Sequence, residues 1–378
     1  MIVFPNPRFR LSLALGEKSV AELPGQLWAA KKNDIVIPFS RGQWALRALV
    51  AGIIKKKGHP RGMICIPEYF CEISLTPLRI PDFDIVFYRL TPELEPDVSH
   101  LEKIKEKFGV PDILLYVHYF GIPLDLSETL RWCYQHDVKL VEDAAHSLLP
   151  VSGIGNHSLP TIYTPWKFLN IPNGALLILP EETSFSPEIR IEWNNFTSYP
   201  FAWITKQLVL SLAQWMKFPM YKFKKIHVKS CDESEPPIDP GCPEIRAISR
   251  IMLARMGVEI QRIGQAREKN YRRLDNAFAV SKVKQCRLFQ NLPEHFTPYV
   301  YPLRIKGASS VDLMIALNRM GIPAQPWSDL SPEVKGSADF PLSNALRKEV
   351  MVLPVHQDLS HAQIDWMGRE VIKMISTH

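Results

Sequence analysis

Short apolar strands alternate with helices through the first half of this chain, and that alternation restricts the folds that it can adopt. The strands are predicted at residues 63–67, 84–90, 111–118, 138–141 and 175–179. They are apolar almost throughout rather than at every second position, which is typical of strands buried on both faces. The pattern therefore predicts an α/β fold whose mostly parallel sheet is covered by helices on both sides.

The helices predicted between these strands bring the strand ends to one edge. One helix is expected after Ser40, which we predict to be its N-cap. Two others are expected at residues 97–108 and 126–136. In parallel sheets, ligand chemistry gathers at the carboxyl ends of the strands. Tyr69, His118 and Asp143 fall at or just beyond such ends, so the sequence predicts a functional site there.

The second half of the chain predicts a smaller lobe. A chain of 378 residues is too long for one small core, which favours two lobes. We place the large α/β domain at residues 1–240, with an N-terminal arm and an atypical helical segment at 187–240. The small α+β domain is placed at 241–378, beginning with a long helix at 245–277 whose apolar residues recur at helical spacing.

Composition argues against several classes of protein. The net charge of +6 is diffuse and no nucleic-acid module is recognisable, so we expect no nucleic-acid partner. None of the six cysteines forms a C-x-x-C pair, and no metal site is predicted. No run of about 18 apolar residues predicts a transmembrane helix, and Pro5 and Pro7 interrupt the segment that a signal peptide would need. We therefore expect a cytoplasmic protein.

Two residues in the segment 140–175 point to a specific cofactor. Asp143 ends a buried strand, and Lys167 follows after a short connecting segment. Pyridoxal 5'-phosphate (PLP) chemistry needs such a pair, because the carboxylate keeps the pyridine nitrogen protonated and the lysine attaches the cofactor as a Schiff base. The alternatives are an ordinary helix N-cap for Asp143 and a surface position for Lys167, although the apolar neighbours of the lysine argue against the latter.

Three short motifs accompany this pair. They are Val117-His-Tyr-Phe-Gly-Ile-Pro-Leu-Asp, Val141-Glu-Asp-Ala-Ala-His-Ser and Leu353-Pro-Val-His-Gln-Asp-Leu-Ser. In these motifs and their order the chain resembles the DegT/StrS family of sugar aminotransferases, over most of its length but not convincingly at 190–240. The resemblance implies a fold-type I PLP transferase with a large α/β domain and a smaller C-terminal α+β domain.

The resemblance also implies an activity. Members of this family move an amino group from an amino acid, here expected to be glutamate or glutamine, to a keto sugar that is nucleotide-linked. Such reactions serve surface polysaccharide or amino-sugar biosynthesis, and the family builds its site at a homodimer interface. By position, Asp143 matches the aspartate at the pyridine nitrogen and Lys167 matches the catalytic lysine. His146 matches a Gln or His near the phenolic oxygen of the cofactor, and its alternative is a structural core histidine.

The expected phosphate and stacking contacts depart from the family pattern. Gly42 and Gln43 stand where the family has Gly-Thr at a helix start, a good place for a phosphate. Ile162 replaces the family serine that contacts the phosphate, and the neighbouring Thr161 is a candidate substitute. Tyr69 is our first choice for the ring that stacks on the pyridine. These departures put the phosphate and stacking contacts in question, but not the Asp143–Lys167 pair.

Two further histidines lie in the family motifs. His118 and His356 are candidate substrate contacts, and a structural histidine at a lobe junction is the alternative for His356.

Two rival functions stay open at this point. A sugar dehydratase of the same family would carry a histidine in place of the lysine, and Lys167 argues against it. A non-catalytic relative that serves as a binding subunit is kept open by Gln43 and Ile162.

The helix expected at 201–218 and the lysines that follow it also allow two interpretations. Contact with a membrane surface through 201–229 is one of them. We favour burial of this helix at a lobe or dimer interface, because long apolar helices are usually internal.

Overall fold

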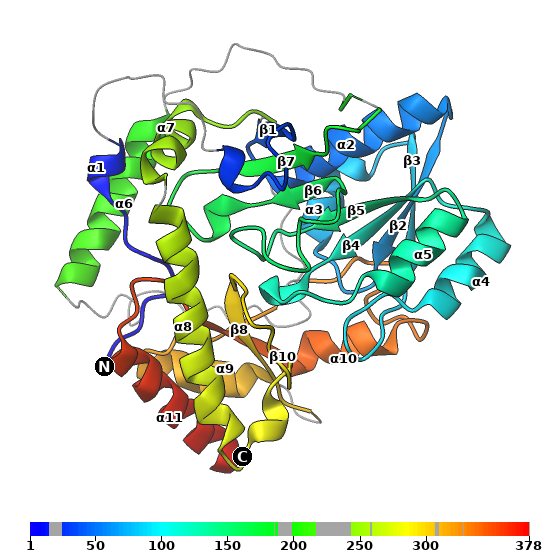
Figure 1. The fold of residues 1–378 in the computed structure, drawn as a ribbon. Coiled ribbons are helices and arrows are strands. Elements are labelled where there is room, and N and C mark those ends of the chain that lie inside the picture. Colours follow the sequence, from blue (N-terminus) through cyan, green and yellow to red (C-terminus); the bar gives the residue numbers. More distant parts are fainter. Residues whose placement is uncertain are drawn as a thin grey trace.

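The computed structural model describes most of the chain (Figure 1). The described residues are 1–14, 25–184, 186–187, 199–216, 243–257, 259–306, 310–327 and 329–377. The boundary predicted at residue 240 and the lysines at 217–229 lie outside these residues. Within them, no helix is long and apolar enough to cross a bilayer.

A seven-stranded, mostly parallel sheet forms the larger body. Its strands lie in the order β1-β7-β6-β5-β4-β2-β3. The strands are β1 (Ile35–Phe39), β2 (Gly62–Pro67), β3 (Phe83–Tyr88), β4 (Ile113–Val117), β5 (Lys139–Asp143), β6 (Thr161–Tyr163) and β7 (Ala175–Leu179). From β3 to β6 all neighbours pair in parallel, whereas β7 is antiparallel to both β6 and β1. The predicted parallel sheet is therefore confirmed.

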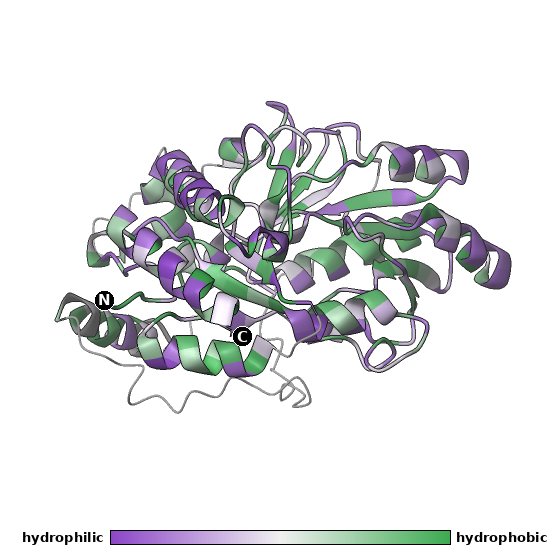
Figure 2. Ribbon diagram, turned by 90° about the horizontal axis from the view of Figure 1, so that it is seen from below, coloured by the Kyte–Doolittle hydropathy of each residue, from purple (hydrophilic) through white to green (hydrophobic). Residues whose placement is uncertain are grey.

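Helices cover this sheet on different sides (Figure 1). The large-body helices are α2 (Gly42–Lys57), α3 (Glu72–Leu75), α4 (Val98–Phe108) and α5 (Ser127–Gln135), with single turns η2 (Thr76–Leu78), η3 (Tyr119–Gly121) and η4 (Pro165–Lys167). Helix α2 packs on β6 and β7, while α4 and α5 pack on β3 and β5. The strands contribute the fully buried side chains of the main core, and Figure 2 shows apolar residues concentrated in the interior.

The smaller body is an α+β lobe. Its three-stranded antiparallel sheet has the order β8-β10-β9, with β8 (Val300–Arg304), β9 (Gln325–Pro326) and β10 (Val350–Pro354). The helical elements around it are α8 (Glu259–Ala279), η6 (Lys284–Cys286), α9 (Ser310–Met320), α10 (Pro341–Glu349) and α11 (His361–Thr377). In Figure 1, α8 and α11 lie side by side at one edge of the molecule.

The remaining elements connect the N-terminal arm to the larger body. They are α1 (Leu11–Ala14), η1 (Gly25–Leu27), α6 (Tyr199–Trp215) and α7 (Ala247–Met256). Trp28 and Phe9 from the arm share an apolar cluster with Met252 of α7. The indole nitrogen of Trp28 donates a hydrogen bond to the carbonyl oxygen of Leu148 at 2.8 Å, which fixes the arm against the loop after β5.

Two local expectations were wrong. The single helix expected at 245–277 is divided into α7 and α8, because Gly257 has a positive φ of 42° that ends the first of them. Ser40 is not the N-cap of α2; Arg41 occupies that position, and its side chain forms no capping hydrogen bond.

Helix α8 joins the two bodies. Ile260 and Ile263, near its start, pack in the cluster of the arm and α7. Tyr271 and Leu274, two to three turns later, pack in the core of the small lobe. The apolar packing therefore changes from one body to the other within a single rigid element.

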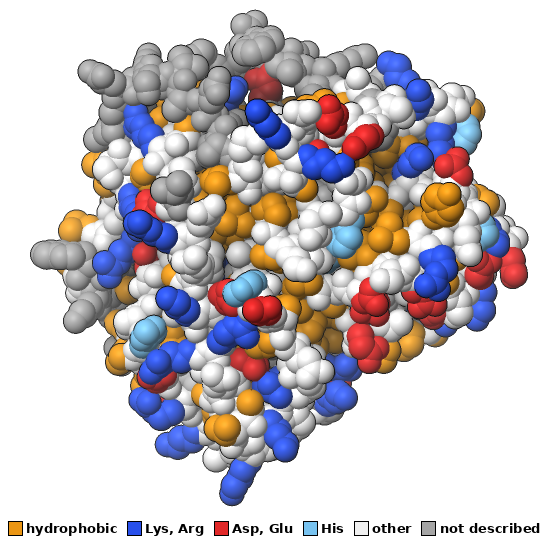
Figure 3. Space-filling view, in the orientation of Figure 1, with side chains coloured by type: hydrophobic (Ala, Val, Ile, Leu, Met, Phe, Trp, Pro, Cys, Tyr) orange, Lys and Arg blue, Asp and Glu red, His pale blue; other side chains and the backbone are white. Residues whose placement is uncertain are grey.

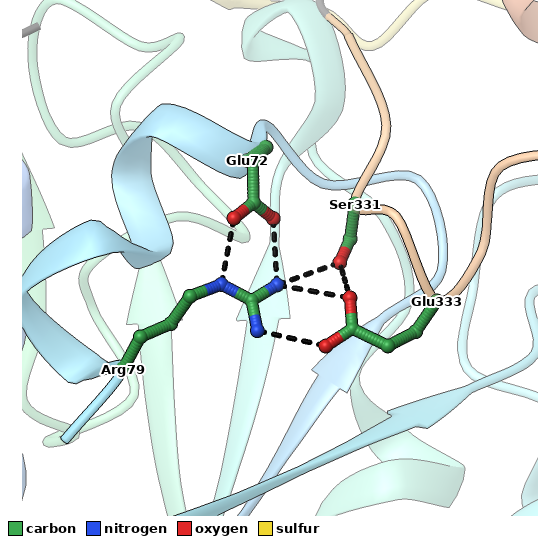
Figure 4. Close-up of polar contacts among 4 residues, drawn as sticks. All are labelled: Glu72, Arg79, Ser331 and Glu333. Carbon is green, nitrogen blue, oxygen red and sulfur yellow. Dashed lines mark hydrogen bonds and ion pairs between the residues drawn. The ribbon is translucent and has the colours of Figure 1, made fainter. Parts of the chain in front are cut away.

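Arg79 forms a second connection between the bodies (Figure 4). Its guanidinium donates to both oxygens of Glu72, at 2.6 and 2.8 Å, and to both oxygens of Glu333, at 2.7 and 2.9 Å. Ser331 accepts a further hydrogen bond at 2.8 Å. This fork of charge-assisted bonds ties the segment after β2 to the loop that follows Trp327.

Candidate active site

The end of β5 fixes the position of Asp143. Parallel pairing places Asp143 opposite Val117 of β4 and Ile162 of β6. The chain then turns, and the Asp143 carboxylate accepts a hydrogen bond from the backbone nitrogen of Ala145 at 2.8 Å. The carboxylate is thus held at the carboxyl edge of the sheet, as the sequence predicted.

Lys167 lies on the single helical turn that follows β6. The backbone nitrogen of Lys167 donates to the carbonyl oxygen of Thr164 at 3.0 Å, and Pro165 starts the turn with a backbone angle suited to it. The Thr164 hydroxyl donates to the carbonyl oxygen of Ala145 at 2.7 Å. This bond joins the turn that carries Lys167 to the turn that follows Asp143.

Asp143 and Lys167 are coupled electrostatically. Burial raises the pKa of Asp143, and the charge of Lys167 partly opposes that rise. Burial lowers the pKa of Lys167, and the charge of Asp143 partly opposes that fall. Both side chains are half-buried, and no direct ion pair joins them in the described part of the chain. The two charges therefore attract each other across a gap.

His146 lies beside this pair and is surrounded by aromatic rings. Its ring stacks on Tyr299 at 6.0 Å and on Phe120 at 6.4 Å, and Trp327 meets it edge-on at 4.9 Å. Burial, with a smaller contribution from the charge of Lys167, holds the pKa of His146 well below its usual range. Its buried Nδ1 has no hydrogen-bond partner among the described residues. The imidazole is therefore neutral, and it has a polar atom available for a ligand.

The start of α2 provides a cationic cradle next to Lys167. A Cβ atom on Gly42 would lie 2.9 Å from Cγ2 of Thr164 and 3.7 Å from Cγ2 of Ile162, so glycine permits this close packing. The Arg41 guanidinium lies 3.8 Å from the centre of the Trp166 ring, and its charge lowers the pKa of Lys167. Arg41, Lys167 and the positive end of a 16-residue helix all favour an anion here.

Arg41 and Cys71 are neighbours of Lys167 that the sequence analysis did not identify. Arg41 directly precedes Gly42, and a cation next to a glycine at a helix start was the available signal. Cys71 is half-buried, and its sulfur interacts electrostatically with Lys167. Tyr69, our choice for the stacking ring, is only 1% exposed and packs against Tyr119 at 5.7 Å. Cys71 is therefore coupled electrostatically to Lys167, and Tyr69 as the stacking ring stays a prediction.

Gln43 lies in the first turn of α2 and is half-buried beside this cradle. Ile162, which replaces the expected serine, is 3% exposed and faces Gly42. The polar contribution at this end of the site comes from Arg41 and the helix backbone rather than from residue 162.

The two histidines expected to contact substrate have structural partners. His118 is fully buried and its Nε2 lies 2.9 Å from Oε2 of Glu142, so it presents no surface to a substrate. The Nε2 of His356 donates to the carbonyl oxygen of Phe4 at 2.8 Å, and its Nδ1 accepts from the nitrogen of Asp358 at 3.3 Å. Burial lowers the pKa of His356 to about 4, so a neutral His356 anchors the N-terminal arm.

A small cavity opens next to Lys167 on the side of the small lobe. It is lined by residues that include Lys167, Arg267, Tyr299, His356 and Asn6. The buried Arg267 guanidinium donates to the carbonyl oxygens of Tyr299 at 2.9 Å and Phe168 at 3.1 Å. Burial lowers the pKa of Arg267 to about 10. Arg267 was not identified from the sequence, although it continues the buried stripe of α8 that runs through Ile263 and Tyr271.

Comparison with known proteins is consistent with this geometry. A sequence model of the DegT/DnrJ/EryC1/StrS aminotransferase family matches residues 91–152, a segment that contains two of the three motifs and Asp143. The resemblance to this family is confirmed. A search of curated proteins finds no match.

Solved structures with the same fold cover the whole chain. Helicobacter pylori PseC, an aminotransferase involved in pseudoaminic acid biosynthesis, superposes with a TM-score of 0.66 at 14% identity, covering 100% of both chains. The PLP form of Spr1654 from Streptococcus pneumoniae, a sugar aminotransferase by its description, gives 0.67 at 15% identity, covering 100% of this chain and 99% of that one. TlmJ, an aminotransferase from Streptoalloteichus hindustanus, gives 0.65 at 16% identity over the same shares. The fold is that of fold-type I PLP aminotransferases.

The residues at the site fit PLP. Asp143, His146 and Lys167 are half-buried, and the Nδ1 of His146 has no partner in the described part of the chain. The cationic cradle of Arg41 and α2 suits the phosphate group. Among the described residues, no group of three His, Cys, Asp or Glu side chains could hold a metal ion instead.

The coupling of Asp143 to Lys167 predicts a titration that can be followed without cofactor. We expect the Lys167 amine in the apo protein to titrate below the ordinary pKa of a lysine. The substitution Asp143→Asn lowers that pKa further, because it removes the nearby negative charge. The measurement is the rate of carbamylation by cyanate as a function of pH, with peptide mass spectrometry at Lys167.

The control for this titration is Asp137→Asn. The side chain of Asp137 is 84% exposed, and this substitution should leave the Lys167 titration unchanged. A midpoint for Lys167 at or above the ordinary lysine value, or one that Asp143→Asn does not move, contradicts the described electrostatics.

Proposed function

We propose that the chain is a PLP-dependent aminotransferase that moves an amino group from an amino acid to a keto sugar. The observation that carries this proposal is the coupled pair of Asp143 and Lys167, held apart at the carboxyl edge of a fold-type I sheet. The family match and the sugar aminotransferases among the structural neighbours support the substrate class.

PLP supplies, when bound, an electron-withdrawing ring that stabilises negative charge at the donor Cα. Asp143 would hold a proton at the pyridine nitrogen, a role that suits an anionic carboxylate fixed by the Ala145 amide. Lys167 would attach the cofactor and, once released, take and return the proton at Cα. Its lowered pKa favours the neutral amine that this role requires.

The other residues of the site would position the cofactor. His146 is neutral, so it can form a hydrogen bond to the phenolic oxygen without adding a second cation beside Lys167. Arg41 and the amides at the start of α2 would bind the phosphate. The aromatic rings of Phe120, Tyr299 and Trp327 enclose His146 and limit the access of water.

Specific residues of this chain argue against both rival functions. A sugar dehydratase of this family would have a histidine at position 167, where this chain has lysine. A non-catalytic subunit was kept open by Gln43 and Ile162, and Arg41 offers a phosphate contact that offsets both departures. We therefore favour an active transferase over either rival.

The amino donor, the acceptor, the pathway and the oligomeric state are inferred from the resemblance to the family. We propose glutamate or glutamine as the amino donor, a nucleotide-linked keto sugar as the acceptor, and a role in surface polysaccharide or amino-sugar biosynthesis. We also propose a homodimer, because the family builds its site between two subunits.

The direct assay is the first half-reaction. Purified protein is incubated with PLP and either glutamate or glutamine, and the 2-oxo acid product is quantified together with the near-visible absorbance. We expect product and a change in absorbance, and a loss of roughly a hundredfold or more in rate for Asp143→Asn. No product and no absorbance change in the wild type would refute the proposed function.

The matched control is again Asp137→Asn, an exposed substitution of the same kind. It should leave the rate of the half-reaction near that of the wild type. Equal losses for the two variants would show that the effect of Asp143→Asn is not specific to the site.

The cradle predicts a separate effect on cofactor affinity. The substitution Arg41→Ala should raise the PLP dissociation constant by roughly tenfold or more, because one charge-assisted contact to the phosphate is lost. Arg47→Ala on the same helix, where the guanidinium lies 5.8 Å from the Trp44 ring, should change it little. The measurement is a PLP titration followed by absorbance. Unchanged affinity in Arg41→Ala would remove Arg41 from the phosphate site.

A further inference from the structure

Arg267 is a buried cation whose hydrogen-bond acceptors are all neutral. It is 2% exposed, and burial lowers its pKa only to about 10, so the guanidinium is charged at neutral pH. Its Nε donates to the side-chain oxygen of Gln357 at 3.0 Å. Its other acceptors are the carbonyl oxygens of Pro298, Tyr299 and Phe168, at 3.4, 2.9 and 3.1 Å. These contacts fix the group in place without cancelling its charge.

The same contacts leave part of the guanidinium unused. The four acceptors leave one of its N–H donors without a partner among the described residues. The charge of Asp358 attracts Arg267, but no ion pair joins the two in the described part of the chain. The Asp358 carboxylate instead accepts from the backbone nitrogen of Arg8 at 2.6 Å. Since buried charges are normally paired, Arg267 has both charge and a donor available for an anion.

The cavity that Arg267 and Lys167 line together carries positive charge only. Its lining contains no aspartate or glutamate from the part of the chain that the structure describes, and His356 is neutral there. Two exposed amide side chains, Asn6 of the arm and Gln325 of β9, complete its polar lining. On the outer surface, by contrast, Lys and Arg side chains are interspersed with Asp and Glu (Figure 3). A cavity with cations and amides but no acid is suited to an anion.

The arm holds Asn6 firmly at this cavity. Residues 5–7 have the sequence Pro-Asn-Pro, so the φ angle on each side of Asn6 is fixed. The carbonyl oxygen of Phe4, just before this segment, accepts from the Nε2 of His356 at 2.8 Å. The last carbonyl oxygen of the segment accepts from the Asn170 amide at 3.1 Å. Asn6 therefore loses little backbone freedom when its amide binds a ligand.

We propose that Arg267, Asn6 and Gln325 bind a carboxylate of the amino donor. The inference rests on the proposed aminotransferase function and names the part of the site that holds the donor. The donor must bring its amine to Lys167, which lines the same cavity, and an amino acid carries a carboxylate close to that amine. The guanidinium attracts the carboxylate, and the two amides donate to its oxygens. The phosphate cradle at Arg41 belongs to a different helix, so the two anions occupy separate places.

The test is a calorimetric titration of the PLP-loaded protein with glutarate, which has the carboxylates of glutamate but no amine. Glutaramide, in which neutral amides replace both carboxylates, is the matched ligand. We expect glutarate to bind, and glutaramide to bind roughly tenfold more weakly or less. Arg267→Lys should raise the glutarate dissociation constant by roughly tenfold or more, because an ammonium cannot reproduce the fixed N–H geometry. Asn6→Ala, an exposed substitution, should raise it by about threefold or more.

The matched control variants are Asn33→Ala and Arg273→Lys. Neither residue lines the cavity: Asn33 is exposed and donates to Glu181, and Arg273 of α8 pairs with Asp365. Both variants should bind glutarate as the wild type does. Thermal unfolding is also measured with and without glutarate. A purely structural role of Arg267 would lower the midpoint of Arg267→Lys but keep the glutarate-induced shift, which would contradict the proposal.

The exposed amides keep the test decisive if Arg267→Lys does not fold. Asn6→Ala and Gln325→Ala then carry it, and in the half-reaction their loss should appear in the donor KM rather than in kcat. Wild-type protein that does not bind glutarate, or that binds glutaramide equally well, would overturn the proposal. Inorganic phosphate that displaces glutarate at a lower concentration than glutarate itself requires would identify a phosphate site instead, and would also overturn it.

The half-reaction separates this inference from the proposed function. If Arg267→Lys and Asn6→Ala both form product with the wild-type KM and bind glutarate with the wild-type affinity, the carboxylate site is refuted and the aminotransferase stands. If glutarate binding is selective and falls in both variants, but the wild type forms no product, the carboxylate site is supported and the proposed function is refuted.

Discussion

The attraction between Asp143 and Lys167 across a gap is the interaction on which the site depends. The two groups come from different segments, and the pairing of β5 with β6 places Asp143 opposite Ile162, five residues before the lysine. A direct ion pair would close the gap and neutralise both groups. Since no direct ion pair joins them among the described residues, the carboxylate and the amine would both be available to the proposed cofactor.

Packing around the pair keeps it in place. The hydrogen bond from Thr164 to Ala145 joins the two turns, and Gly42 allows α2 to approach Thr164 closely. Behind the sheet edge, the buried Glu142 accepts hydrogen bonds from His118 and the backbone nitrogen of Gly155 and pairs with His157, and these contacts lower the pKa of Glu142 to about 2 despite its burial. Glu142 therefore stays charged next to Asp143, and Arg79 ties the segment after β2 to the loop that follows Trp327.

The sequence predicted the parallel sheet and the positions of Asp143, His146 and Lys167, because strand periodicity and short motifs are local properties of the chain. It did not predict the orientation of side chains. Tyr69 packs against Tyr119 in the core, whereas Cys71 is coupled electrostatically to Lys167. Arg41 at the N-cap of α2 and Arg267 on the buried stripe of α8 lie close to Lys167 without any motif that marks them. The break between α7 and α8 was missed because one glycine interrupts an otherwise continuous helical pattern.

The proposed mechanism requires that Lys167 attach PLP. The most direct measurement is borohydride reduction of the purified protein with PLP, followed by digestion and mass spectrometry of the peptides. We expect a phosphopyridoxyl group on Lys167 in the wild type, none in Lys167→Ala, and normal labelling when the exposed Lys206 is replaced by alanine. Label distributed over surface lysines, and equal in the wild type and Lys167→Ala, would contradict it.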